Sequence, residues 1–179
     1  MPGKMRAVLK TAAGEGLEMR EVPLPRIKPD EVLVRVRAAS ICGTDVHIYK
    51  WDAWSRSRIG TGRLPQITGH EVAGEVVEVG SHVTRVRPGD YISAETHIPC
   101  RNCIQCLAGQ PHICDRLNIL GVDRDGAFAE YIAIPDAVCW VNDPAIPPEF
   151  ASVQEPLGNA MYAVMGEDHD VAGKSQVGF

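Results

Sequence analysis

Four cysteines fall within fifteen residues of this chain, at the spacing C-x2-C-x2-C-x7-C: Cys100, Cys103, Cys106 and Cys114. A loop that gathers four thiolates can complete the tetrahedral shell of a structural zinc ion and leaves no position open for a substrate. The metal-binding free energy is then the folding free energy of the loop. We therefore expect a zinc-stabilised lobe over residues 97–117.

Other uses of these cysteines remain open at this point. Two disulfides would require an oxidising compartment, but residues 1–10 lack an apolar signal segment and no apolar run reaches the length of a membrane span. We therefore expect a cytoplasmic protein without a membrane partner. Iron–sulfur runs of the C-x2-C-x2-C type continue with x3-C-P, whereas seven residues separate Cys106 from Cys114. His97 and His112 lie near enough in sequence to be substitute ligands.

The strand pattern predicts a mainly β fold. Short runs rich in valine and isoleucine are separated by glycine and proline, which favours a small, partly open β-barrel with a few peripheral helices. Valine alternates with other side chains in residues 31–38, which predicts a strand with one buried face. The expected strands are 7–10, 17–22, 31–38, 71–79, 91–97 and 127–134, and the expected helices are 43–50, 149–154 and 158–165.

Composition and charge exclude some partners. Hydrophobic residues make up 45% and charged residues 23% of the 179, as in an ordinary globular domain. The net charge is −5 and basic residues form no cluster, so nucleic acid is not an expected partner.

A second set of possible metal ligands lies outside the cysteine loop. Cys42, His70 and Glu71 offer the thiolate, imidazole and carboxylate of a catalytic zinc site, in which three protein ligands leave one position open. A metal there polarises a bound oxygen, so an alcohol ionises near neutral pH and its carbon can release hydride. Taken singly, each residue also has an ordinary structural use. A lone cysteine is usually a small buried hydrophobe, as we expect for Cys139.

Three separate motifs resemble the zinc-dependent medium-chain alcohol dehydrogenases. The run G-H-E-x2-G-x5-G-x2-V that begins at Gly69 is similar to the zinc signature of that family. The run I-C-G-T-D-x-H that begins at Ile41 resembles its first catalytic-ligand segment, and the four-cysteine loop resembles its structural zinc lobe. The resemblance extends from about residue 5 to 175 and implies a GroES-like catalytic domain.

The resemblance implies a catalytic zinc held by Cys42 and His70, with Glu71 as a ligand or a carboxylate close to it. Glu155 would be a fourth group that exchanges with water or substrate. The family pattern thus implies two zinc ions, one catalytic and one structural, together with a small-molecule alcohol as substrate. Members of the family are commonly oligomers, so a homo-oligomer is a further expectation.

The resemblance also implies that Thr44 and His47 pass the proton of the alcohol towards solvent. A hydroxyl that hands a proton to an imidazole titrating near neutral pH is chemically suited to this. From the residues alone, Thr44 could instead cap a helix, His47 could be an exposed helix residue, and Glu155 could be a solvated carboxylate in a first helical turn.

Hydride transfer in this family requires NAD, bound to a Rossmann domain with a G-x-G-x-x-G turn. The G-x-G pairs that begin at Gly14 and Gly60 both lack the third glycine, and Asp168 stands where a P-loop before Gly173 would need its first glycine. We therefore expect no cofactor-binding residues in this chain.

We accordingly expect a catalytic domain over residues 1–165, a truncated linker towards a missing NAD-binding domain over 166–179, and no hydride transfer by the chain alone. Polyol or butanediol dehydrogenases share these motifs, and a non-enzymatic zinc-binding scaffold is the remaining alternative.

Overall fold

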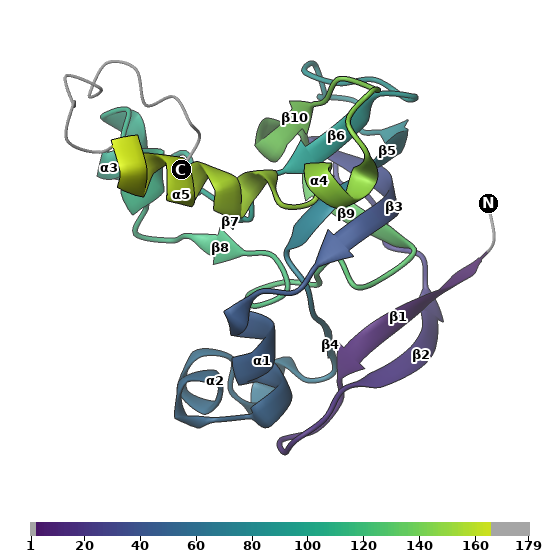
Figure 1. Cartoon of the computed structure of the whole chain (residues 1–179), viewed down its shortest axis with the longest axis vertical. Coiled ribbons are helices and arrows are strands. Elements are labelled where there is room, and N and C mark those ends of the chain that lie inside the picture. The colour runs from purple at the N-terminus through teal and green to yellow at the C-terminus, as the bar shows by residue number, and fades with distance from the viewer. Residues whose placement is uncertain (1–2, 166–179) are drawn as a thin grey trace.

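The computed structural model describes residues 3–165, which are built mainly from short strands (Figure 1). The strands are β1 (Lys4–Lys10), β2 (Glu18–Pro23), β3 (Glu31–Ser40), β4 (Gln66–Ile67), β5 (Glu71–Val79), β6 (Tyr91–Ala94), β7 (His97–Ile98), β8 (Asn118–Ile119), β9 (Tyr131–Pro135) and β10 (Cys139–Val141).

Five of these strands form the central antiparallel sheet, in the order β10-β6-β5-β3-β9. Apolar side chains from all five strands make the main hydrophobic core. β5 crosses β3 closely at Gly74, where a Cβ atom would lie 2.4 Å from the carbonyl oxygen of Arg35. The pairing register also shifts beside this glycine, between Val36 and Ala38. A side chain at Gly74 would therefore hold the two strands apart.

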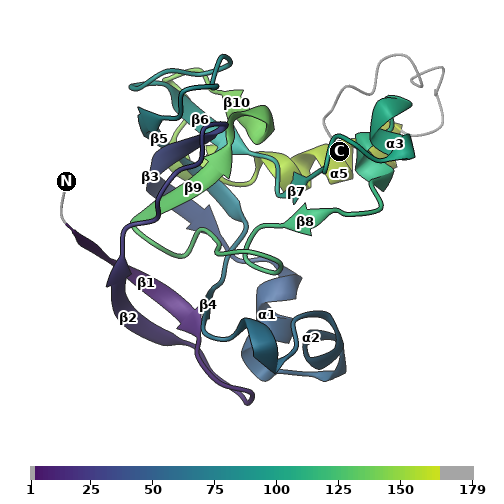
Figure 2. The ribbon, with the colours of Figure 1, turned by 180° about the vertical axis from the view of Figure 1, so that it is seen from behind.

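A smaller sheet in the order β2-β1-β4 lies beside the central one (Figure 2). Met5, Leu9 and Ile67 are buried in its own core cluster. A single bridge between Ala7 and Ala129 joins β1 to the segment that leads into β9. β7 and β8 form a third, two-stranded sheet. The described strands thus make open sheets and no closed barrel, which confirms a mainly β, partly open fold.

Five short helices of the described residues lie at the edges of these sheets (Figure 1). They are α1 (Gly43–Lys50), α2 (Ala53–Arg58), α3 (Ile104–Leu107), α4 (Pro148–Ala151) and α5 (Gln154–Met165), with 3₁₀ turns at Thr61–Arg63, Pro111–Ile113 and Asp136–Val138. The expected helix over 43–50 is confirmed. The expected helix over 158–165 is longer in the structure, where α5 already begins at Gln154, four residues earlier.

Two expected strands have different bounds. The strand predicted over 91–97 ends at Ala94, because the N–H of Glu95 donates to Val138 O at 2.8 Å and His97 pairs with Ile119 in another sheet. Residues in this stretch therefore change partner halfway along.

The strand predicted over 127–134 begins only at Tyr131. The residues before Tyr131 make backbone hydrogen bonds to the loop that precedes β5. The N–H of Ala127, for example, donates to Gly69 O at 2.8 Å. The one-sided burial predicted for 31–38 is also wrong, since Glu31 and Leu33 are both 2% exposed. Both faces of that strand are covered at its start.

Candidate metal centres

The four cysteines of the expected zinc lobe converge in the structure. Their four sulfur atoms all lie within 4.8 Å of one another. The lobe leaves the body between β7 and β8, and α3 begins directly after Cys103. All six cysteines are free thiols. The backbone N–H groups of Cys100 and Arg116 donate to the sulfur of Cys114 at 3.2 and 3.3 Å, as they would to a thiolate.

The crowding of these sulfurs suits a cation. A hydrogen bond from the backbone of Asn102 lowers the pKa of Cys100 to about 6, whereas removal from water raises the pKa of Cys106 to about 12. Thiols this close oppose one another's ionisation unless a positive charge lies between them. A Cys₄ donor set is that of structural zinc, so the residues fit the metal.

Cys42, His70 and Glu71 also converge, each offering one ligand atom within 4.8 Å of the other two. Cys42 is the N-cap of α1, and His70 and Glu71 lie where β5 begins. His70 and Glu71 are each 5% exposed. Thiolate, imidazole and carboxylate in a largely buried site are the donor types of catalytic zinc, so these residues fit that ion.

Two residues that the sequence did not single out hold the three ligands in place. Asp45 is 3% exposed, and its carboxylate accepts the N–H of Cys42 at 3.0 Å and that of Gly69 at 3.2 Å. Burial raises the pKa of Asp45. Its Oδ1 lies 3.7 Å from Nδ1 of His70. Ser40 donates its hydroxyl to Glu71 Oε2 at 2.5 Å.

Asp45 had a local sequence signal. An acidic residue three positions after an N-cap commonly returns to the N-cap N–H, as in a capping box. Cys42 and Asp45 have this spacing, but the expectation needs a helix that begins at Gly43. Carboxylates that contact metal-ligating histidines commonly orient the imidazole ring. Ser40 had no comparable signal, because its contact depends on the pairing of β3 with β5.

Gly69, Gly121 and Gly126 form a glycine crossing directly before His70, where two backbone segments pass each other in close contact. Gly69 has φ 86°, and a Cβ atom there would lie 2.4 Å from the ring of Phe128. A Cβ atom at Gly121 or Gly126 would lie 2.4 or 2.0 Å from Gly69 O. Backbone therefore contacts backbone at this point, and the segment after β8 sets the position of the start of β5.

The structure places Thr44 near the ligand group and His47 at the surface. The hydroxyl oxygen of Thr44 lies 3.8 Å from the sulfur of Cys42. The His47 side chain is 56% exposed, and its Nδ1 lies 2.5 Å from Oδ2 of Asp52. Its ring also lies 5.9 Å from the ring of Trp54.

Glu155 belongs to a third group, with Glu95 and His97, whose ligand atoms lie within 4.8 Å of one another. His97 Nδ1 lies 2.8 Å from Glu95 and 3.8 Å from Glu155. Burial, followed by the charge of Glu95, raises the pKa of Glu155, and the charge of Glu71 adds to this effect. A hydrogen bond to Glu95 raises the pKa of His97. The structure thus brings Glu155 near the ligands but not into their cluster.

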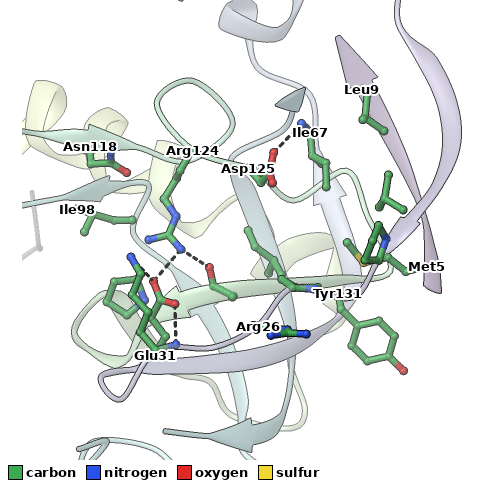
Figure 3. Close-up of a pocket in the computed structure, with 18 of the residues that line it drawn as sticks. Met5, Leu9, Arg26, Glu31, Ile67, Ile98, Asn118, Arg124, Asp125 and Tyr131 are labelled. Carbon is green, nitrogen blue, oxygen red and sulfur yellow. Dashed lines mark hydrogen bonds and ion pairs between the residues drawn. The ribbon is translucent and has the colours of Figure 1, made fainter. Parts of the chain in front are cut away.

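A cavity of about 750 Å³ lies elsewhere, between β1, β2, β9 and residues 23–31 (Figure 3). Met5, Leu9 and Ile67 line one side, and the ion pair of Arg124 with Glu31, at 2.8 Å, lies on the other. None of the candidate metal ligands lines it. The cavity is therefore separate from the metal centres.

Within residues 3–165, every helix is too short or too polar to span a lipid bilayer. Residues 28–144, more than half of the chain, match the family model of the alcohol dehydrogenase GroES-like domain.

The chain is 55% identical over 168 residues to the L-threonine 3-dehydrogenase of Symbiobacterium thermophilum and 52% identical over 175 residues to that of Pyrococcus horikoshii. These alignments cover 94% and 98% of this chain but 47% and 49% of the relatives. The chain therefore spans about half the length of the curated relatives that it matches.

Solved dehydrogenase structures are similar to the chain. Galactitol-1-phosphate dehydrogenase from Escherichia coli matches with a TM-score of 0.78 and 29% identity, covering 89% of this chain and 44% of that one. The cobalt- and zinc-bound thermostable alcohol dehydrogenase from Pyrobaculum aerophilum matches with a TM-score of 0.72 and 29% identity, covering 85% and 45%. The chain belongs to the zinc-dependent medium-chain alcohol dehydrogenase family, of which it carries the GroES-like domain.

Proposed function

We propose that this chain is the catalytic domain of a zinc- and NAD-dependent dehydrogenase that oxidises L-threonine to 2-amino-3-oxobutanoate. The convergence of Cys42, His70 and Glu71 within 4.8 Å carries the proposal. The choice of substrate is supported by relatives named L-threonine 3-dehydrogenase that are 50–55% identical. It is also supported by the resemblance of residues 40–49, 95–98 and 154–160 to that branch of the family.

In the proposed site Cys42 and His70 hold a catalytic zinc, and Glu71, oriented by Ser40, is a ligand or a nearby carboxylate. Asp45 faces Nδ1 of His70, which leaves the other ring nitrogen for the metal. A zinc ion supplies Lewis acidity that makes an alcohol more acidic. NAD supplies the hydride acceptor. The four-cysteine lobe holds the structural zinc.

The chain's own residues then bind the substrate and move its proton. Thr44, beside the sulfur of Cys42, takes the alcohol proton as it gives its own to His47. His47 is exposed and returns the proton to water. Glu155 and Glu95 form a buried acidic wall suited to the ammonium group of an amino acid. Glu155 would also be the fourth group at the zinc site, in exchange with water or substrate.

We further propose that residues 1–165 are the catalytic domain and that 166–179, which lie outside the described residues, are a linker towards a nucleotide-binding domain. The chain has no G-x-G-x-x-G turn, so it should not reduce NAD by itself.

A chimera tests the function. This chain would replace the matching 168 residues of the Symbiobacterium thermophilum enzyme, to which it is 55% identical. The chimera should form NADH with L-threonine and carry two zinc ions per chain. Cys42→Ala should remove one zinc ion and lower kcat/KM by at least about a hundredfold, whereas Cys139→Ala, a matched change at a buried cysteine outside both sites, should retain both zinc ions.

Three results would contradict parts of the proposal. Faster turnover of a polyol or of 2,3-butanediol than of threonine would reassign the substrate. No turnover by a chimera that holds two zinc ions would favour a binding scaffold. NADH formation by the chain alone would contradict the proposed domain division.

A further inference from the structure

The chain reverses direction where α1 ends. Trp51 takes a left-handed backbone conformation, with φ 53° and ψ 47°, which bulky residues rarely adopt. The N–H of Trp51 donates to Ile48 O at 3.2 Å and that of Asp52 donates to His47 O at 3.4 Å. This turn brings the side chain of Asp52 back beside His47, five residues earlier in the chain.

Buried contacts hold the turn. The Trp51 side chain is 6% exposed and packs with Ile48 in a core cluster. The ammonium group of Lys10, itself 1% exposed, lies 5.3 Å from the Trp51 ring centre and donates to Tyr49 O at 3.1 Å and to Gly16 O at 2.9 Å. A cation at the carboxyl end of a helix and over an indole ring stabilises both. The buried contacts of Trp51 therefore fix the position of Asp52, the next residue in the chain.

Both carboxylate oxygens of Asp52 have defined partners. Oδ1 accepts the N–H of Ser55 at 3.0 Å, which caps α2, and Oδ2 lies 2.5 Å from Nδ1 of His47. The N–H of Ser55, and then the imidazole, lower the pKa of Asp52. An ionised carboxylate only accepts hydrogen bonds, so Nδ1 of His47 must carry a hydrogen.

We propose that Asp52 is a positioning residue that fixes neutral His47 in its Nδ1–H form and directs Nε2 to act as the base of the proton path. The catalytic part of this inference rests on the proposed function. In each turnover Nε2 accepts the proton that the Thr44 hydroxyl releases, and the imidazolium then loses that proton to water. Asp52 stays ionised throughout and is not itself a proton acceptor.

The tautomer can be measured in the zinc-loaded chain. Long-range ¹H–¹⁵N NMR of ¹⁵N-histidine protein at alkaline pH distinguishes the Nδ1–H from the Nε2–H form, and His47→Gln assigns the signals among the six histidines. Asp52→Asn keeps an acceptor at the N-cap of α2 but loses the charge. The ratio of Nδ1–H to Nε2–H forms should fall by about tenfold or more. Asp143→Asn is the matched control, because its carboxylate accepts the backbone N–H of Ala145.

A residue that only capped α2 would leave the tautomer of His47 unchanged in Asp52→Asn, and that result would overturn the positioning role. A predominantly Nε2–H form in the unmodified chain would do the same. Should Asp52→Asn fail to fold, Asp52→Ser retains a capping hydroxyl on a side chain too short to reach His47, and the same readings apply.

The chimera separates this inference from the proposed function. Asp52→Asn should lower its kcat about tenfold with little change in KM and both zinc ions retained, whereas Cys42→Ala should lose one ion. A shifted tautomer with an unchanged kcat would overturn the catalytic part and leave the positioning role standing. An inactive parent chimera with His47 in the Nδ1–H form would contradict the proposed function alone.

Discussion

Replacing Gly126 by alanine tests whether backbone contact sets the position of His70. A Cβ atom at Gly126 would lie 2.0 Å from Gly69 O and 2.6 Å from Thr68 O, whereas ordinary contacts lie at 3.4–4 Å. The backbone on one side must therefore retreat by about 1.4 Å. Thr68 and His70 are buried, so no flexible side chain can absorb this movement.

The expected change in the free energy of unfolding follows from two opposing effects. Forcing an extra carbon into a packed interior costs about 1–3 kcal/mol, while alanine restricts the unfolded chain and returns about 0.4–1 kcal/mol. We expect Gly126→Ala to lower the free energy of unfolding by about 1–2 kcal/mol. With a slope near 2 kcal/mol per molar urea, the unfolding midpoint should fall by about 0.5–1 M. The affinity of the Cys42 site for zinc should fall by about tenfold, because His70 is displaced.

Gly62→Ala is the matched control, since nothing lies within 4 Å of a Cβ atom there and its φ is not left-handed. Urea unfolding of both zinc-loaded variants, followed by circular dichroism, gives the midpoints, and chelator titration gives the zinc affinities. Equal midpoints for Gly126→Ala and Gly62→Ala would refute the view that this crossing is tightly packed.

Two further predictions concern Cys103 and Cys139. Cys103→Ala should make the lobe over residues 97–117 sensitive to limited proteolysis while the body stays protected, because the lobe folds around its metal; a protected lobe would contradict the structural site. Burial raises the pKa of Cys139 to about 12, above its unfolded value of about 9. The neutral thiol therefore contributes its whole stabilisation below about pH 9, and this contribution is lost as the pH rises towards 12. Urea midpoints measured from about pH 8 to about pH 11 should therefore fall less in Cys139→Ala, and parallel curves would count against this reading.

Local patterns were enough to predict much of the fold. The strand over 71–79 and the helix over 43–50 match the observed elements, because a run rich in valine and glycine and the helix signals are local. The strand that continues past Ala94 was mispredicted, because residues 95–98 bond to partners distant in sequence. Tertiary pairing decided those bounds, and a local pattern does not report it.

The candidate site shows the same division. The spacing of the four cysteines predicted their convergence, since one short loop carries them all. The grouping of Cys42 with His70 needed the family resemblance. Asp52 was missed, because its contact with His47 depends on the left-handed turn at Trp51, which no glycine marks.

The glycine crossing also bears on when each metal can bind during folding. The cysteine ligands lie within one loop of fifteen residues, so closing it costs little chain entropy and can occur early. The start of β5 gains its position only when Gly126, more than fifty residues after Gly69, has packed against it. Contacts between such distant segments form late. A chain supplied with one equivalent of zinc as it refolds should therefore load the lobe first, and the reaction site would receive its ion from a nearly finished fold.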